Sequence, residues 1–191
     1  MPKKDVRQVT DLRVLAAMAH PLRRRLIDLL KVDGPATASM LAERTGEAVG
    51  NISHHVKVLA ASDLVEEAPE LARDRRERWW RVVSAAVRWS ARDFESDPAT
   101  AAVATAAASL GLDRQVGLLN AWRAASSQEH AAWGEGPFST DSWMRLSADE
   151  LAELSQEVVG LIRRWADRDI PDDGVERGSV FVFAHGIPAH P

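Results

Sequence analysis

The sequence predicts a mainly α-helical protein, with a two-stranded hairpin near the middle of the chain and a small two-stranded sheet toward its C-terminal end. Three observations predict this class. Apolar residues recur at helical spacing through most of the first 60 residues. Residues 78–83 form an aromatic, strand-like segment directly after a basic run. Residues 179–184 form an apolar segment that follows an amphipathic helix.

The composition is that of a folded globular chain. Of its 191 residues, 46% are hydrophobic and 27% are charged, an ordinary balance for a packed domain. Because no stretch has the length of a membrane span or the pattern of a secretion signal, we expect a cytoplasmic protein with no membrane partner. The absence of cysteine excludes disulfides and thiolate metal sites, and the six histidines form no helical ligand pair. We therefore expect neither a metal nor a cofactor.

Charge is distributed unevenly along the chain. Residues 1–90 carry 16 Lys and Arg against 12 Asp and Glu, a net of +4, whereas residues 91–191 carry 8 against 16, a net of −8. A basic first half and an acidic second half indicate different roles. The alternative is that two solvated surfaces simply differ.

Two helices are predicted before residue 33. Apolar residues share one helical face over 12–19, and a second such pattern runs over 22–30. His20-Pro21 separates the two, because the residue before a proline is disfavoured in helical conformation.

The pattern of a helix-turn-helix follows. Thr37 precedes a short helix over 38–45, in which Met40 and Leu41 are predicted to point inward. Gly46 is typical of a helix C-cap, and a second helix is predicted over about 47–60. The apolar residues of this second helix fall at spacings of 3, 4 and 3, and they are Val49, Ile52, Val56 and Leu59.

The opposite face of the second helix is short, polar and nearly uncharged. A solvated helix face is usually dense in Glu, Lys and Arg, whereas short polar side chains can contact base edges in a major groove. The alternative is a small helical core with a polar exterior. The residues of this face are Gly50, Asn51, Ser53, His54 and Lys57.

A basic hairpin is predicted next. Residues 64–68 and 78–83 are strand-like, and the run 73–78 between them holds four arginines. A hairpin with a basic tip beside a helix-turn-helix is a wing. The predicted fold class of this half is thus a winged helix-turn-helix with a two-stranded wing, whose arginines contact phosphate or enter the minor groove.

Several of these motifs occur together in a known family. With His-Pro-x-Arg at 20–23 and Ser-x-His-hydrophobic-Lys-x-Leu at 53–59, residues 10–84 resemble the ArsR-like winged-helix regulators. The resemblance implies a homodimer that binds double-stranded DNA, represses promoters and releases them on binding an effector. The family's Cys-x-Cys metal ligands and its metal-binding last helix have no counterpart here, so metal sensing is not implied. Asp63 stands where the family usually has glycine, which predicts a slightly strained turn.

The resemblance and the predicted wing together assign the candidate DNA contacts. Residues of the second helix would face DNA, and Arg23 and the wing arginines would touch its backbone. His55 corresponds to a histidine that packs or contacts phosphate. The candidates are Arg23, Thr37, Ser39, Gly50, Asn51, Ser53, His54, His55, Lys57, Arg73, Arg75, Arg76 and Arg78.

The chain is predicted to divide after Ser84. Residues 1–84 would form the DNA-binding domain, and residues 85–191 a dimerisation and candidate effector-binding region. The second region is predicted to begin with a helix over 85–94 that places Trp89 and Phe94 in the core.

An alanine-rich helix is predicted to follow. Asp97-Pro98 is typical of a helix start, and residues 99–110 carry no charge. Gly111 is predicted to break or bend this helix before a further piece that ends at Ala125. The helix packs either within the chain or across a homodimer, and we favour the homodimer.

The last third of the chain has a strand–helix–strand pattern. Residues 142–146 are strand-like, Ser147-x-x-Glu150 is a capping box, and an apolar helical face runs on to Trp165. Residues 179–184 are again strand-like, so we expect the two strands to pair beneath the helix. Trp122, Trp133 and Trp143 flank a glycine-rich loop and are candidates to line a pocket for a small-molecule effector, although such tryptophans are more often core.

No catalytic motif is present. The sequence has no glycine-rich phosphate loop after a strand and no Gly-x-Ser-x-Gly, so we expect no enzyme activity. The predicted function is a sequence-specific DNA-binding transcriptional regulator that acts as a homodimeric repressor. The alternative is a winged-helix protein-interaction module without specific DNA binding.

Overall fold

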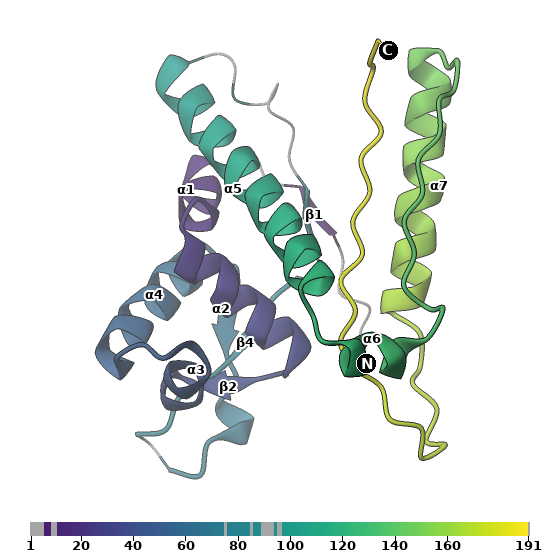
Figure 1. The fold of residues 1–191 in the computed structure, drawn as a ribbon. Coiled ribbons are helices and arrows are strands. Elements are labelled where there is room, and N and C mark those ends of the chain that lie inside the picture. Colours follow the sequence, from purple (N-terminus) through teal and green to yellow (C-terminus); the bar gives the residue numbers. More distant parts are fainter. Residues whose placement is uncertain are drawn as a thin grey trace. The chain divides into compact units, whose positions relative to one another are not determined.

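The computed structural model describes residues 6–8, 11–74, 76–84, 86–88, 94 and 97–190. They form two compact units, Met1–Gly117 and Leu118–Pro191 (Figure 1). The first unit therefore extends well beyond the boundary expected after Ser84. The reason is packing, since Phe94 and Ala104 are buried in the same core as the first helices. In addition, Arg114 Nε lies 2.5 Å from Asp28 Oδ2.

The first two helices are α1 (Leu12–Met18) and α2 (Pro21–Val32), as predicted. Asp11 caps α1 by accepting a 2.8 Å hydrogen bond from the backbone N–H of Arg13. His20 is extended, with φ −137°, and Pro21 opens α2 at a position where its missing N–H costs nothing.

The helix-turn-helix is confirmed as α3 (Ala38–Thr45) and α4 (Val49–Ala61). Thr37 Oγ1 caps α3 by accepting from the backbone N–H of Met40 at 3.3 Å. Gly46 has φ +77°, the left-handed conformation that ends α3 and turns the chain toward α4.

The core lies where these four helices meet. Ile52, Val56 and Leu59 of α4 are fully buried, as predicted, but Val49 is 47% exposed because it is the first residue of the helix. In α3, Leu41 is buried, whereas Met40 is 43% exposed and its predicted inward direction is wrong. Neighbouring helical residues point about 100° apart, so only one of the two faces the core.

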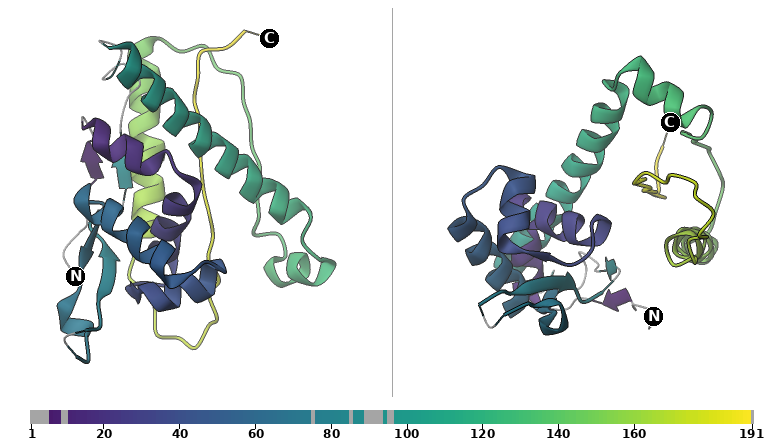
Figure 2. Two further views of the ribbon diagram at one scale, coloured as in Figure 1. Left: turned by 90° about the vertical axis from the view of Figure 1, so that its left-hand side faces the viewer. Right: turned by 90° about the horizontal axis from the view of Figure 1, so that it is seen from below.

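The predicted hairpin is confirmed and belongs to a three-stranded antiparallel sheet. Its strands β3 (Val65–Glu67) and β4 (Trp79–Val82) pair with Val65 opposite Val82, and β2 (Ala36–Thr37) adds to the other edge of β4. The loop between β3 and β4 begins with a 3-10 helix, η1 (Pro69–Leu71), and projects beyond the helices (Figure 2). Asp63, just before β3, has φ +51°, which is the strained turn that was predicted.

The helix predicted over 85–94 is wrong. Residues Ala86–Arg88 are a strand, β5, which pairs in parallel with β1 (Val6–Gln8). The partner strand is almost 80 residues away in sequence, so a local pattern does not reveal it. Phe94 is buried, as predicted, whereas Trp89 lies outside the described residues.

The alanine-rich segment is one uninterrupted helix, α5 (Pro98–Arg123). Asp97 caps it by accepting from the Thr100 backbone N–H at 3.0 Å, as predicted. The break predicted at Gly111 is wrong, because a glycine inside a helix costs only about 1 kcal/mol and the flanking residues favour the helix. Ala104 and Ala107 are buried within the chain, so this part of α5 packs on the first unit itself.

The second unit contains two helices, α6 (Ser127–Trp133) and α7 (Ala148–Ala166). Each begins with a reciprocal capping box, Ser126 with Glu129 and Ser147 with Glu150. The prediction of α7 is confirmed, and α6 was not anticipated as a separate helix.

The two-stranded sheet predicted for this unit is wrong. Residues 142–146 and 179–184 are all described, and none is in a strand. A strand gains stability from a hydrogen-bonded neighbour and a buried face, yet the side chains of Val180 and Phe181 are 67% and 44% exposed. Among the helices of the described residues, none is long and apolar enough to cross a membrane.

Candidate nucleic-acid interface

The outer face of α4 presents the polar residues singled out in the sequence. Gly50, Asn51, His54 and Lys57 are exposed and Ser53 is half-buried, while the opposite side of the helix is in the core. The Asn51 side-chain amide donates to Glu47 Oε2 at 2.9 Å. This contact leaves its carbonyl oxygen available and holds the side chain at the start of the helix.

His55 lies on the buried side of α4. Its side chain is 8% exposed, and its ring centroid is 4.6 Å from that of His20. The Nδ1 atoms of both rings are buried without a hydrogen-bond partner among the described residues. Of the two roles considered for His55, the structure favours packing.

This environment disfavours charge on both rings. Burial lowers the pKa of His55 below its ordinary value, and the nearby positive charges of His20, Arg23 and His54 lower it further against a weaker opposing effect of Glu47. Burial, followed by the charge of Arg23, also lowers the pKa of His20. Both rings are therefore favoured in the neutral form.

Arg23 is engaged inside the fold. Its Nε donates to the carbonyl of Ala17 at 2.6 Å and its Nη2 to that of Ala16 at 2.8 Å. These carbonyls belong to the last turn of α1, where backbone acceptors lack helical partners. Arg23 thus caps α1, a role that the sequence pattern did not reveal.

The first turn of α3 carries two further candidates. Thr37 is half-buried and its oxygen already accepts from the backbone N–H of Met40. Ser39 is exposed beside it. Both lie at the N-terminal end of α3, where backbone N–H groups favour an anion such as phosphate.

The tip of the hairpin is organised by its acidic residues. Asp74 Oδ1 accepts from the backbone N–H groups of Arg76 and Glu77 at 2.7 and 3.0 Å, and Glu77 Oε2 accepts from that of Arg73 at 2.8 Å. In the sequence these carboxylates only reduce the charge of the tip. In the structure they shape the turn that exposes Arg73 and Arg76.

Other wing arginines are paired within the sheet. Arg78 Nη1 lies 3.1 Å from Glu67 Oε1, and Arg81 pairs with Glu66 at 2.7 Å and also with Glu70. Arg78 remains 61% exposed and within reach of a ligand. Arg81 was not anticipated, because its partners lie on the opposite strand and on η1. Arg75 lies outside the described residues.

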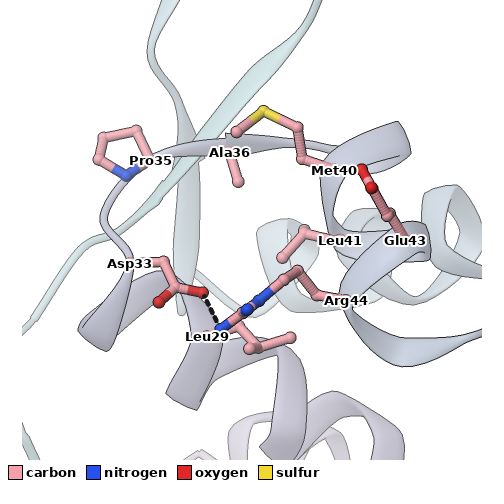
Figure 3. Close-up of a pocket in the computed structure, with 8 residues that line it drawn as sticks. All are labelled: Leu29, Asp33, Pro35, Ala36, Met40, Leu41, Glu43 and Arg44. Atoms are coloured by element: carbon pink, nitrogen blue, oxygen red, sulfur yellow. Dashed lines mark ion pairs between the residues drawn. The ribbon is translucent and has the colours of Figure 1, made fainter. Parts of the chain in front are cut away.

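A cavity of about 310 Å³ lies between the end of α2, β2 and α3 (Figure 3). Its lining is mainly apolar and includes Leu29, Pro35 and Met40. Arg44 Nη2 and Asp33 Oδ2 form an ion pair of 3.0 Å at its edge (Figure 3).

The three candidate pocket tryptophans do not line this cavity. The ring of Trp122 is 4.5 Å from that of His130, whose Nε2 lies 2.9 Å from the Trp122 carbonyl oxygen. Trp133 lies against Gly178, where a Cβ would be only 2.8 Å from its ring, and Trp143 is 67% exposed. A metal site is also not formed within the described part of the chain, where no three His, Cys, Asp or Glu residues converge.

Comparison with known proteins identifies the region that contains α3 and α4. Residues 18–68 match the family model of a helix-turn-helix domain, a range that spans α2, β2, α3, α4 and β3. The chain therefore carries a helix-turn-helix domain. No curated protein matches the chain.

Solved structures with partial likeness include two bacterial proteins. HlyU from Vibrio cholerae is 20% identical, with 40% of this chain and 77% of that chain covered and a TM-score of 0.34. A mutant of ZitR from Lactococcus lactis in its apo form is 13% identical, with 78% and 81% covered and a TM-score of 0.27.

Proposed function

We propose that this protein is a sequence-specific DNA-binding transcriptional regulator that acts as a homodimeric repressor. The observation that carries the proposal is the outer face of α4, a row of polar side chains on a helix whose opposite face buries Ile52, Val56 and Leu59 in the core. A helix held in this way can enter a major groove without losing its packing.

The proposed contacts divide into two kinds. Asn51, Ser53 and His54 contact base edges. An asparagine can bond adenine through both the carbonyl oxygen and the NH2 group of its side-chain amide. Lys57, Ser39 and Thr37 contact phosphate from α4 and from the start of α3.

The wing supplies the remaining contacts. Its tip exposes Arg73 and Arg76, which clamp the backbone or the minor groove beside the site of α4. We propose the same role for Arg75 and Arg78. Gly50 lets the backbone of α4 approach the groove closely, since no other group occupies the space a Cβ would take.

A second copy would place another α4 about one helical turn of DNA away and so lengthen the recognised sequence. We propose that residues beyond the wing supply the dimer contacts. On α5, Leu112, Val116 and Leu119 are each more than 40% exposed at helical spacing, and α7 has a comparable face. An apolar effector could bind the cavity beside α3 or the tryptophans of the second unit.

The alternative is a winged-helix module that binds protein. The ion pairs of Arg78 with Glu67 and of Arg81 with Glu66 favour it, because they neutralise part of the wing. Selection of bound genomic fragments, followed by fluorescence anisotropy over a salt series, distinguishes the two. We expect specific complexes whose affinity falls steeply with salt, because phosphate contacts release counterions. If no fragment is enriched at low salt, the protein-interaction module is the better description.

A further inference from the structure

Helix α7 carries an apolar seam whose last two members are exposed and whose first three are half-buried. Its members alternate at spacings of 3 and 4, which is the heptad pattern of paired helices, and none is buried. Leu161 is 48% exposed and Trp165 is 62% exposed. We call this set the α7 seam, and it consists of Leu151, Leu154, Val158, Leu161 and Trp165.

The charges beside the seam differ between the two ends of α7. The first half of the helix carries only carboxylates among its charged residues, whereas the last turn carries two arginines and is followed by Asp167 and Arg168. Two such helices side by side in opposite directions bring unlike charges together, and their helix dipoles also oppose. The charged residues are Asp149, Glu150, Glu153 and Glu157 at one end, and Arg163, Arg164, Asp167 and Arg168 at the other.

We propose that α7 packs in antiparallel orientation against α7 of a second copy of this chain. The register that stacks Leu154 on the partner's Trp165 and Val158 on the partner's Leu161 also brings Glu157 beside the partner's Arg164. Two-fold symmetry forms each contact twice. The contact rests on the proposed homodimer and specifies the surface that forms it.

The rest of the second unit is compatible with this register. Leu151 lies outside the stacked part of the seam, and its Cδ1 is already 3.3 Å from the Cβ that a side chain at Gly186 would have. The C-terminal segment therefore covers one end of the seam and leaves the other end for the partner. The straight course of α7, seen end-on in the right-hand view of Figure 2, suits a helix pair.

Other occupants fit the charges less well. A parallel pair would place Glu157 beside the partner's Ile162, so no ion pair would form there, and the two helix dipoles would point the same way. A membrane surface prefers helices with a basic polar face, whereas that of α7 carries four carboxylates.

Charge reversal tests the orientation in the full chain by sedimentation equilibrium. Glu157→Arg places two arginines together in each of two symmetric contacts, so we expect the dimer dissociation constant to rise roughly tenfold. The double variant Glu157→Arg/Arg164→Glu restores unlike charges and should recover most of the affinity. Glu176→Arg, outside α7, is the control and should leave the constant unchanged. An unchanged constant for Glu157→Arg, or no recovery in the double variant, overturns the contact.

Disulfide trapping tests the register, because the natural chain has no cysteine. Chains with Leu154→Cys mixed with chains with Trp165→Cys should form mixed disulfide dimers under mild oxidation, faster than either variant alone. In the proposed pair, the two copies of position 154 are about 16 Å apart along the helix axis. Preferential cross-linking of each variant with itself would overturn the antiparallel register.

The contact and the proposed function can fail separately. A chain that binds DNA specifically, but whose dimerisation is insensitive to α7 and lost in Val116→Glu, places the interface on α5 and overturns the contact alone. If the chain dimerises through α7 but enriches no DNA fragment, the α7 contact stands and the proposed DNA-binding function is overturned.

Discussion

The two units of the molecule are stabilised in different ways. Every buried hydrophobic residue described lies between Val14 and Ala107, in the first unit. None of residues 118–190 is buried. The first unit thus has a core of its own, whereas the second gains little from burying its apolar side chains against one another.

The sequence signals that start a helix are stronger in the second unit than in the first. α7 begins with a complete capping box, whereas the N-cap residue of α4 is Ala48, which offers no side-chain cap. α4 is held by Ile52, Val56 and Leu59 in the core. The helix proposed to contact DNA therefore depends on tertiary packing. Helix α7 depends more on local capping and has an apolar face that no core covers.

The largest expected effect tests where the core lies. Leu59→Ala removes a fully buried side chain, and we expect it to lower the free energy of unfolding by about 2–5 kcal/mol. Leu161→Ala, at a site 48% exposed, should cost less than about 1 kcal/mol when measured on the monomer. Urea denaturation followed by tryptophan fluorescence measures both. Equal losses would contradict the division between the units.

The second test compares an asparagine from each unit. Asn51→Ala should weaken specific DNA binding by about 1–3 kcal/mol and relax the preference at one base pair. Asn120→Ala, an exposed asparagine of α5, is the matched control and should bind as the natural chain does. Fluorescence anisotropy with single-base variants of a selected site measures the change.

The wing provides the complementary result. Arg73→Ala/Arg76→Ala should weaken binding to all sequences alike and flatten the salt dependence. Arg123→Ala, an exposed arginine of α5, is its control. If the wing and Asn51 variants changed sequence preference in the same way, the assignment of base and phosphate contacts would be wrong.

The third test uses pH. His20 and His55 have pKa values lowered below the ordinary 6.5, so the folded state binds their protons less readily than the unfolded state. Their stabilising contribution is complete above pH 6.5 and is lost as the pH falls below it toward the folded-state values. The melting temperature of the first unit should be lower at pH 5.5 than at pH 7.5. His55→Leu should flatten this dependence, and an unchanged slope would argue against the buried pair as its cause.

The smallest expected effects come from two glycines. Gly46→Ala forces a side chain into a left-handed turn and should destabilise the first unit by about 1 kcal/mol. Gly111→Ala lies inside α5 with open space around its Cβ and should stabilise by about 0.5–1 kcal/mol. Thermal denaturation resolves the opposite signs, and a loss at Gly111 would indicate that α5 bends there.

The sequence predicted well those elements whose signals are local. The bounds of α3 and α4 follow from Thr37, Gly46 and the apolar spacing of α4, and the polar face of α4 is on the side predicted. Arg23 shows the limit for the site, because its acceptors are the carbonyls of another helix. A side chain that caps a neighbouring helix has the same sequence signal as one that faces DNA.

The sequence by itself determined the helices α1 to α4 and α7, the caps at Thr37, Gly46 and Ser147, the strained turn at Asp63 and the wing hairpin, since each depends on residues a few positions apart. Only the tertiary structure decided that β1 pairs with β5, that β2 joins the wing sheet, and that His55 lies against His20. It also decided that residues 142–146 and 179–184 do not form the expected sheet. The physical reason is the same in each case. A strand or a buried polar ring is stabilised by a partner that is distant in the chain. The residues next to it in sequence do not indicate which residue that partner is.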